Sequence, residues 1–227
     1  MNFYSHWFNP PVLWAANGVC LILMFITFPA ACRIIRTHHA AVVSATLMLA
    51  LFWGLRANIT DGHLAGMSYH LMGVALAALM LGAAGALWLC GMLMLAACVI
   101  FGGIDNLTAW GINLICCIIP PVFISTLLLR FAQKRLPENV FVYIFVNGFL
   151  AAIIGMAFIA LCVGISLYSA QVFNTETLLQ QVLPLFILIA WGDAFLTGLF
   201  SAVFIAFAPQ FLSTFNDEHY LKRQTDW

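Results

Sequence analysis

The sequence predicts an all-α, polytopic bundle of transmembrane helices, and three observations support this prediction. Of the 227 residues, 64% are hydrophobic and only 7% are charged. A soluble domain carries about 25% charged residues, so this chain has too few charges to cover a soluble surface. The apolar residues also fall in long runs, and a transmembrane helix needs about 20 of them in succession. Finally, the connections between the runs are short, which predicts a single integral membrane domain over residues 1–227.

The lengths of the apolar runs predict seven spans. In chain order, these are residues 12–32, 40–55, 66–82, 84–101, 108–129, 140–166 and 182–207. Only Gly82-Ala83 separates the third span from the fourth, which predicts a tight hairpin. The second span is short and ends at Arg56, whose aliphatic stem can reach along the apolar surface to the membrane interface. Pro120-Pro121 falls inside the fifth span and predicts a kink, because two backbone donors are missing there.

The positions of the basic residues predict the orientation of the chain. With seven crossings, Arg56 lies on one side of the membrane and the other Lys and Arg residues lie on the opposite side. These are Arg33, Arg36, Arg130, Lys134, Arg135, Lys222 and Arg223. Because basic loops stay in the cytoplasm, we expect the N-terminus outside and the C-terminus in the cytoplasm. A formal net charge of zero argues against a nucleic-acid partner and leaves membrane lipid as the expected surroundings.

The densest cluster of polar residues covers residues 58–70, at the start of the expected third span. A charged group at membrane depth costs at least about 2.5–3.5 kcal/mol, so each one needs a reason. One interpretation makes His70 an imidazole ligand for an ion that enters from outside, assisted by His63, Asp61 or Met67. In the other, His70 bonds a neighbouring helix, while Asp61 and His63 are solvated. The residues alone leave both interpretations open.

Further polar residues occur near the start of the chain and in two other expected spans. Asp105 or Asn106 is expected to cap the fifth span, and Asn113 could supply a carbonyl oxygen to a site. Asp193 lies near the middle of the last span, where no Lys or Arg can pair with it, so we expect a hydrogen-bonded or protonated carboxyl. We expect Asp105, like Asp193, to be a buried polar group. His6, beside Trp7 and Phe8, is typical of an aromatic interface anchor.

Several of these segments resemble, in order, the CbiM-type permeases of energy-coupling factor transporters. Residues 68–82, S-Y-H-L-M-G-V-A-L-A-A-L-M-L-G, resemble that family's S-G-H-L-x-G motif and the small-residue helix after it. Residues 101–113 are similar to its glycine-rich stretch ending in a-L-G-x-N, and residues 193–198 resemble its E-G/A-x-x-T-G motif, with Asp193 in place of Glu. Residues 136–145 resemble proteobacterial relatives. Together these matches run from about residue 58 to the C-terminus.

The resemblance implies a substrate-binding membrane subunit, not an enzyme, that captures a divalent transition metal such as cobalt or nickel at the inner membrane. His70 corresponds to the family's metal-binding histidine. The sequence has no nucleotide-binding P-loop, so a separate transmembrane coupling protein and ABC-type ATPase subunits would energise uptake. Nitrogen ligands suit Co²⁺ and Ni²⁺, but the order of affinities alone does not separate these ions from Cu²⁺ or Zn²⁺.

The start of the chain departs from the family. Its members begin Met-His, and the terminal amine, a backbone amide and that imidazole bind the metal; here Asn2 follows Met1. Either His6 or His63 substitutes, or the ligand set differs, or this branch handles another substrate. A non-transporting membrane partner or scaffold in metalloenzyme assembly is the alternative function. A haem protein or intramembrane enzyme is a third hypothesis; haem would need two histidines on facing helices, and only His70 lies well inside an expected span.

Overall fold

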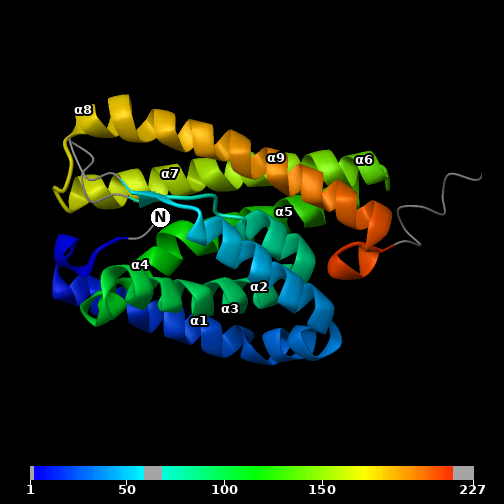
Figure 1. The fold of residues 1–227 in the computed structure, drawn as a ribbon, viewed down its shortest axis with the longest axis horizontal. Helices are drawn as coiled ribbons and strands as arrows, with labels where there is room; N and C mark the ends of the chain where they lie inside the picture. The colour runs from blue at the N-terminus through cyan, green and yellow to red at the C-terminus, as the bar shows by residue number, and fades with distance from the viewer. Residues whose placement is uncertain (1–2, 59–67, 217–227) are drawn as a thin grey trace, which may run out of the picture.

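The computed structural model describes residues 3–58 and 68–216, and this part of the chain is a bundle of long helices joined by short connections (Figure 1). The elements in chain order are η1 (Ser5–Trp7), α1 (Pro10–Thr37), α2 (His39–Gly54), β1 (Ala57–Asn58), β2 (Ser68–Tyr69), α3 (Val74–Gly102), η2 (Ile104–Ala109), α4 (Trp110–Asn113), η3 (Leu114–Ile118), α5 (Ile119–Arg135), α6 (Val140–Val142), η4 (Tyr143–Leu150), α7 (Ala151–Ser169), α8 (Thr175–Thr177), η5 (Leu178–Val182), α9 (Leu183–Phe207) and η6 (Pro209–Phe211). The predicted all-α class is confirmed, since the only strands of the described chain form one two-residue pair.

Five helices of the described chain are long and apolar enough to cross a membrane. They are Pro10–Thr37, Val74–Gly102, Ile104–Arg135, Val140–Ser169 and Thr175–Phe207. Helix α2 is apolar but has only 16 residues, which is about 24 Å of helix against a hydrocarbon core of about 30 Å. The described chain is therefore a multi-pass membrane bundle with five helices of spanning length, where seven spans were predicted.

The predicted corner at Gly82-Ala83 coincides with a break in α3. Gly82 has φ 66° and ψ 177°, a conformation open mainly to glycine. Residues 74–81 lie beside the segment that follows α9 and η6, since the carbonyls of Met80 and Leu79 accept hydrogen bonds from the amides of Ser213 and Thr214. Residues after Gly82 run beside α1 instead, where the Trp88 indole donates to the carbonyl of Met24.

The expected third span, residues 66–82, is therefore wrong as a spanning helix. Residues 68–73 are not helical, and Gly73, with φ 64°, precedes the helix that follows. Residues 74–81 then extend only about 12 Å, too little to cross a bilayer. Apolar run length could not reveal this, because the extended segment is as apolar as a helix and its backbone groups are bonded by residues distant in sequence.

π-helical turns, which are wider than α-helical turns, occur beside the prolines or near the starts of the long helices. Pro120 and Pro121 lie in the first turn of α5, directly after the π-helical turn η3. A π-helical turn shifts the hydrogen-bond pattern, which accommodates the missing donors of the two prolines. A kink was predicted at Pro120-Pro121, and what the structure has there is a π-helical turn, Leu114–Ile118, directly before the two prolines.

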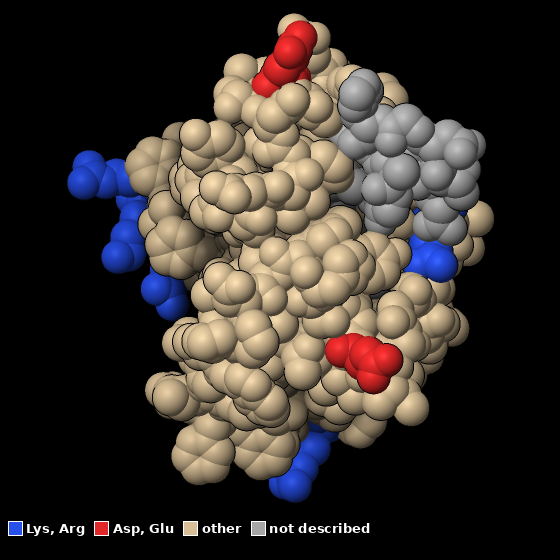
Figure 2. Space-filling view, turned by 90° about the vertical axis from the view of Figure 1, so that its left-hand side faces the viewer, with Lys and Arg blue, Asp and Glu red and all other residues tan. Residues whose placement is uncertain are grey.

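One hydrophobic cluster shows which helix ends lie together. It brings together Ile34 near the end of α1, Ala41 in α2, Leu129 near the end of α5, Val140 at the start of α6 and Leu212 after α9. The basic residues near these ends, which are Arg33, Arg36, Arg130, Lys134 and Arg135, therefore lie at one end of the bundle. Figure 2 looks onto the opposite end, where α1 begins, and most side chains there are uncharged.

Candidate metal-binding site

The extended segment of residues 68–73 lies inside the bundle and is held by partners from three elements. Strand β2 pairs with β1, with Tyr69 opposite Ala57. The indole Nε1 of Trp53 donates to the carbonyl of Met72 at 2.9 Å. The amide of Gly73 donates to Oδ1 of Asp193 at 2.7 Å. Non-helical backbone inside a membrane protein needs such partners, because no bulk water is available to it.

Asp193 is thus the link between α9 and the segment that carries His70. Its side chain is 3% exposed, so it is buried as expected. The predicted hydrogen-bonded carboxyl is confirmed by the bond from the Gly73 amide. This bond ties the extended segment to α9.

His70 lies on the connection between α2 and α3, outside the spanning helices, and is 9% exposed. Its Nδ1 lies 2.9 Å from the carbonyl oxygen of Leu71, and its ring centroid lies 5.6 Å from that of Trp53. Because a carbonyl only accepts, Nδ1 carries the hydrogen, and the neutral imidazole then has its lone pair on Nε2. Burial lowers the pKa of His70 well below its usual 6.5, which favours this neutral form.

A small cavity of about 10 Å³ adjoins the His70 ring. Its described lining consists of Tyr69, His70, Met72, Met156, Ile159, Phe186 and Ile189. Side chains alternate along an extended backbone, so His70 and Met72 point to the same side. The intervening Leu71 packs next to Gly192 of α9, where an added Cβ would lie 3.2 Å from Leu71 Cδ2. A space of this size holds about one water molecule or a single ion.

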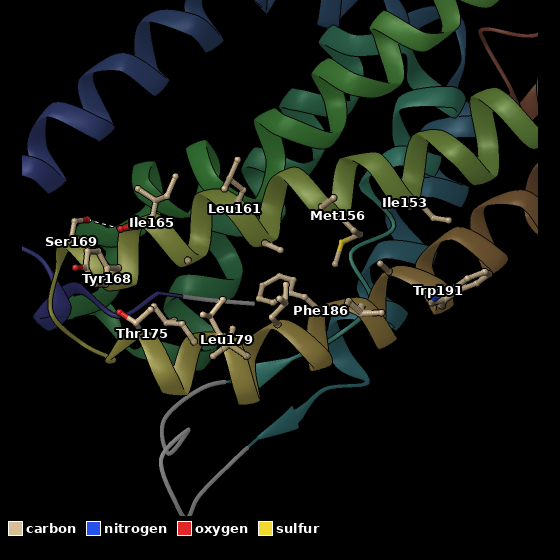
Figure 3. A pocket seen from close by; sticks show the side chains of 18 residues that line it. Ile153, Met156, Leu161, Ile165, Tyr168, Ser169, Thr175, Leu179, Phe186 and Trp191 are labelled. Atoms are coloured by element: carbon tan, nitrogen blue, oxygen red, sulfur yellow. Dashed lines mark hydrogen bonds between the residues drawn. The ribbon is translucent and has the colours of Figure 1, made fainter.

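A larger apolar groove of about 780 Å³ lies between α7 and α9, next to this cavity (Figure 3). Met156 from α7 and Phe186 from α9 line both the groove and the cavity. These two side chains therefore form a wall between the groove and the space beside His70.

Asn113 and Asn106 hold the beginning of the described chain. The Phe3 amide donates to Oδ1 of Asn113 at 2.7 Å, and the Ser5 amide donates to Oδ1 of Asn106 at 2.7 Å. Both asparagine side chains also donate to the carbonyl of Phe3 at 3.2 Å. The carbonyl oxygen that we expected Asn113 to offer to a site is thus bound to the N-terminal segment.

Two expectations about Asp105 are wrong. Neither Asp105 nor Asn106 is the N-cap, because η2 begins after Gly103 and has no side-chain cap. The Asp105 side chain is exposed, since it lies in a turn beyond the end of α3. It is therefore a surface group of the described chain.

The remaining predicted site residues are not brought to His70 within the described chain. His6 is exposed and stacks on Tyr4, with ring centroids 5.6 Å apart and planes 28° apart. Asp61 and His63 lie outside the described residues. In the part of the chain that is described, no group of three or more His, Cys, Asp or Glu could hold a metal ion, and His70 is the only buried histidine.

Sequence reasoning missed the residues that complete the surroundings of His70. Trp53 contacts Met72 across 19 positions of sequence, and Met156 and Phe186 come from helices much later in the chain. No local pattern marks them, because Met and Phe within apolar runs are typical of any membrane helix. The sequence could have shown that His70 and Met72 lie on the same side, because side chains alternate along an extended backbone. That would have required residues 68–73 to be recognised as extended.

Removal of the Asp193 carboxyl tests its positioning role. In Asp193→Ala the buried Gly73 amide loses its acceptor, which costs about 1–3 kcal/mol. We expect lower thermal stability and, because the His70 segment loosens, a 10- to 100-fold loss of metal affinity, about the effect of outer-shell changes at metal sites.

Asp193→Asn is the matched control, since its amide oxygen can still accept from Gly73, and it should recover most of the stability. An Ala variant as stable as the unmodified protein would contradict the positioning role. Thermal unfolding and metal titration of the same samples measure both effects.

The fold and this site together define a multi-pass helical membrane protein with a buried imidazole on an irregular segment between its helices. Residues 4–211 match the family model CbiM, described as the cobalt uptake substrate-specific transmembrane region. The chain therefore belongs to the CbiM family, which makes it a transmembrane component of cobalt uptake. No curated protein and no solved structure matches this chain.

Proposed function

We propose that this protein captures a divalent ion, Co²⁺ or Ni²⁺, on the outer side of the inner membrane and that His70 is a ligand. The observation that carries the proposal is the placement of His70. Its imidazole lies beside a single-ion cavity, on a segment fixed by Trp53 and Asp193. The Nδ1–H bond to Leu71 orients the ring so that Nε2 is the ligand atom.

The proposed orientation places the N-terminus outside and the C-terminus in the cytoplasm. The clustered ends of α1 and α5 carry Arg33, Arg36, Arg130, Lys134 and Arg135 on one end of the bundle. Since short basic loops remain in the cytoplasm, this end faces inward. The beginning of α1 then faces outward, where an ion would enter.

Uptake against a gradient needs energy from partner proteins. The sequence contains no P-loop, so we propose a separate transmembrane coupling protein and ABC-type ATPase subunits. Co-purification of such subunits with the full-length protein would support this assignment. Stable association with a metalloenzyme assembly partner, together with an absence of metal binding, would favour the scaffold function instead.

Titration of the purified full-length protein with Co²⁺ and Ni²⁺ tests the proposed function. We expect about one ion per chain, because the cavity has room for a single ion. Mg²⁺ is the control ion and should not compete, because it prefers oxygen ligands and keeps its waters. Isothermal calorimetry measures the stoichiometry, and a flat titration with both transition metals would contradict the proposal.

A further inference from the structure

We propose that the cavity beside His70 also binds Cu(I), with the thioether sulfurs of Met72 and Met156 as ligands together with His70 Nε2. This inference rests on the proposed function, since the same imidazole serves both kinds of ion. It extends the substrate range to a soft monovalent metal.

The two methionines line the cavity from different elements. Met72 follows His70 by two positions on the extended segment, is 2% exposed, and is fixed through its carbonyl by the Trp53 indole. Met156 projects from α7 and is also 2% exposed. Figure 3 shows its sulfur in the space between α7 and α9. His70, Met72 and Met156 thus line one small cavity, and together these residues carry one nitrogen and two sulfur donors.

The kinds of donor atom favour a soft ion. Thioether sulfur is a soft ligand that selects Cu(I), whereas Mg²⁺, Ca²⁺ and Mn²⁺ take carboxylate, carbonyl and water oxygens. Apart from Tyr69, the rest of the described lining is Ile159, Phe186 and Ile189, which are apolar. These three residues add no further donor atom to the cavity.

The charge of the surroundings is compatible with a monovalent ion. Among the described residues, Asp193 is the only buried acidic side chain. It lies four residues after Ile189 and seven after Phe186, so it shares the helix face that lines the cavity. One carboxylate on this face balances the single charge of Cu(I), so this ion needs no further anionic ligand in a site of low polarity.

Competition with a chromogenic Cu(I) chelator, bicinchoninate, under anaerobic reducing conditions tests the inference on the full-length protein in detergent. The variants are Met72→Leu, Met156→Leu and the double substitution; such swaps nearly conserve volume. We expect Cu(I) affinity to fall at least about tenfold for each lost thioether, as even outer-shell changes do at metal sites. Co²⁺ affinity should change less than about threefold, because its nitrogen ligand remains.

Met94→Leu is the matched control, since Met94 is a buried methionine of α3 that does not line the cavity, and its Cu(I) affinity should equal that of the unmodified protein. X-ray absorption of the Cu(I)-loaded unmodified protein is independent of how the variants fold. It should show sulfur bound to copper.

Unchanged Cu(I) affinity in the double variant, or a copper shell without sulfur, would overturn the inference. Either result leaves the proposed function standing if Co²⁺ still binds. If the unmodified protein bound neither Co²⁺ nor Ni²⁺, the proposed function would be overturned instead. The two failures are therefore distinguishable.

Discussion

His70→Ala is expected to abolish measurable binding of Co²⁺ and Ni²⁺ to the purified protein. In the described chain, His70 is the one buried histidine, and it contributes the nitrogen donor that adjoins the cavity. Outer-shell changes already cost 10- to 100-fold in metal affinity, so loss of a ligand should cost at least about 100-fold. Calorimetric titration measures the effect, and thermal unfolding without metal shows whether the variant is folded.

His39→Ala is the control for this experiment. His39 is exposed at the start of α2 and lies at the basic end of the bundle, away from the cavity. Its removal should leave metal affinity unchanged. His6→Ala asks whether the exposed N-terminal histidine takes part, and we expect unchanged affinity because His6 stacks on Tyr4 at the surface. If a folded His70→Ala variant still bound one ion, the site would lie elsewhere.

Gly111→Ala is expected to cause the largest loss of stability, at least about 3 kcal/mol, the upper end for overpacking. A Cβ atom at Gly111 would lie 2.5 Å from the backbone nitrogen of Asn17 and 2.6 Å from the carbonyl carbon of Ala16. Both clashing atoms are backbone, so α1 and α4 would have to separate. The Gly111 amide also donates to Oδ1 of Asn17 at 2.7 Å, and that bond would be lost with the contact. Such close approach at small residues is a general feature of membrane helices.

Gly18→Ala is the matched control, because a Cβ at Gly18 of α1 meets nothing within 4 Å. Alanine is favoured over glycine inside a helix by about 1 kcal/mol, so this variant should be unchanged or more stable. Size-exclusion chromatography and thermal unfolding compare the two variants. Equal stability of both would show that α1 and α4 do not depend on this backbone contact.

Much of the fold was predictable because the signals are local. Composition alone identifies a membrane protein, and the apolar runs locate α1, α2 and the long helices close to their observed bounds. A corner was predicted at Gly82-Ala83, as a tight hairpin between two spans, and the structure has a break in α3 at Gly82. The interpretation of residues 66–82 as a spanning helix was wrong because it also relied on local apolar run length. An apolar run in a protein interior can be either helical or extended, and its length does not separate the two.

The candidate site was less predictable because its partners are distant in sequence. His70 and Asp193 were singled out, since polar groups in apolar surroundings are costly whatever the fold. That the Asp193 carboxyl accepts from Gly73, 120 positions earlier, has no counterpart in any local pattern. The same holds for Asn113, whose expected free carbonyl instead holds Phe3.

By itself, then, the sequence determined that this is a helical membrane protein and which few polar residues lie in apolar surroundings. Both follow from the free energy of transfer of each residue type from water to an apolar environment. The tertiary structure alone decided that the His70 segment is extended and that Met72 and Met156 line the same cavity as His70. The reason is that extended backbone inside a bundle is stable only where other helices supply its hydrogen bonds, and here Trp53 and Asp193 do so.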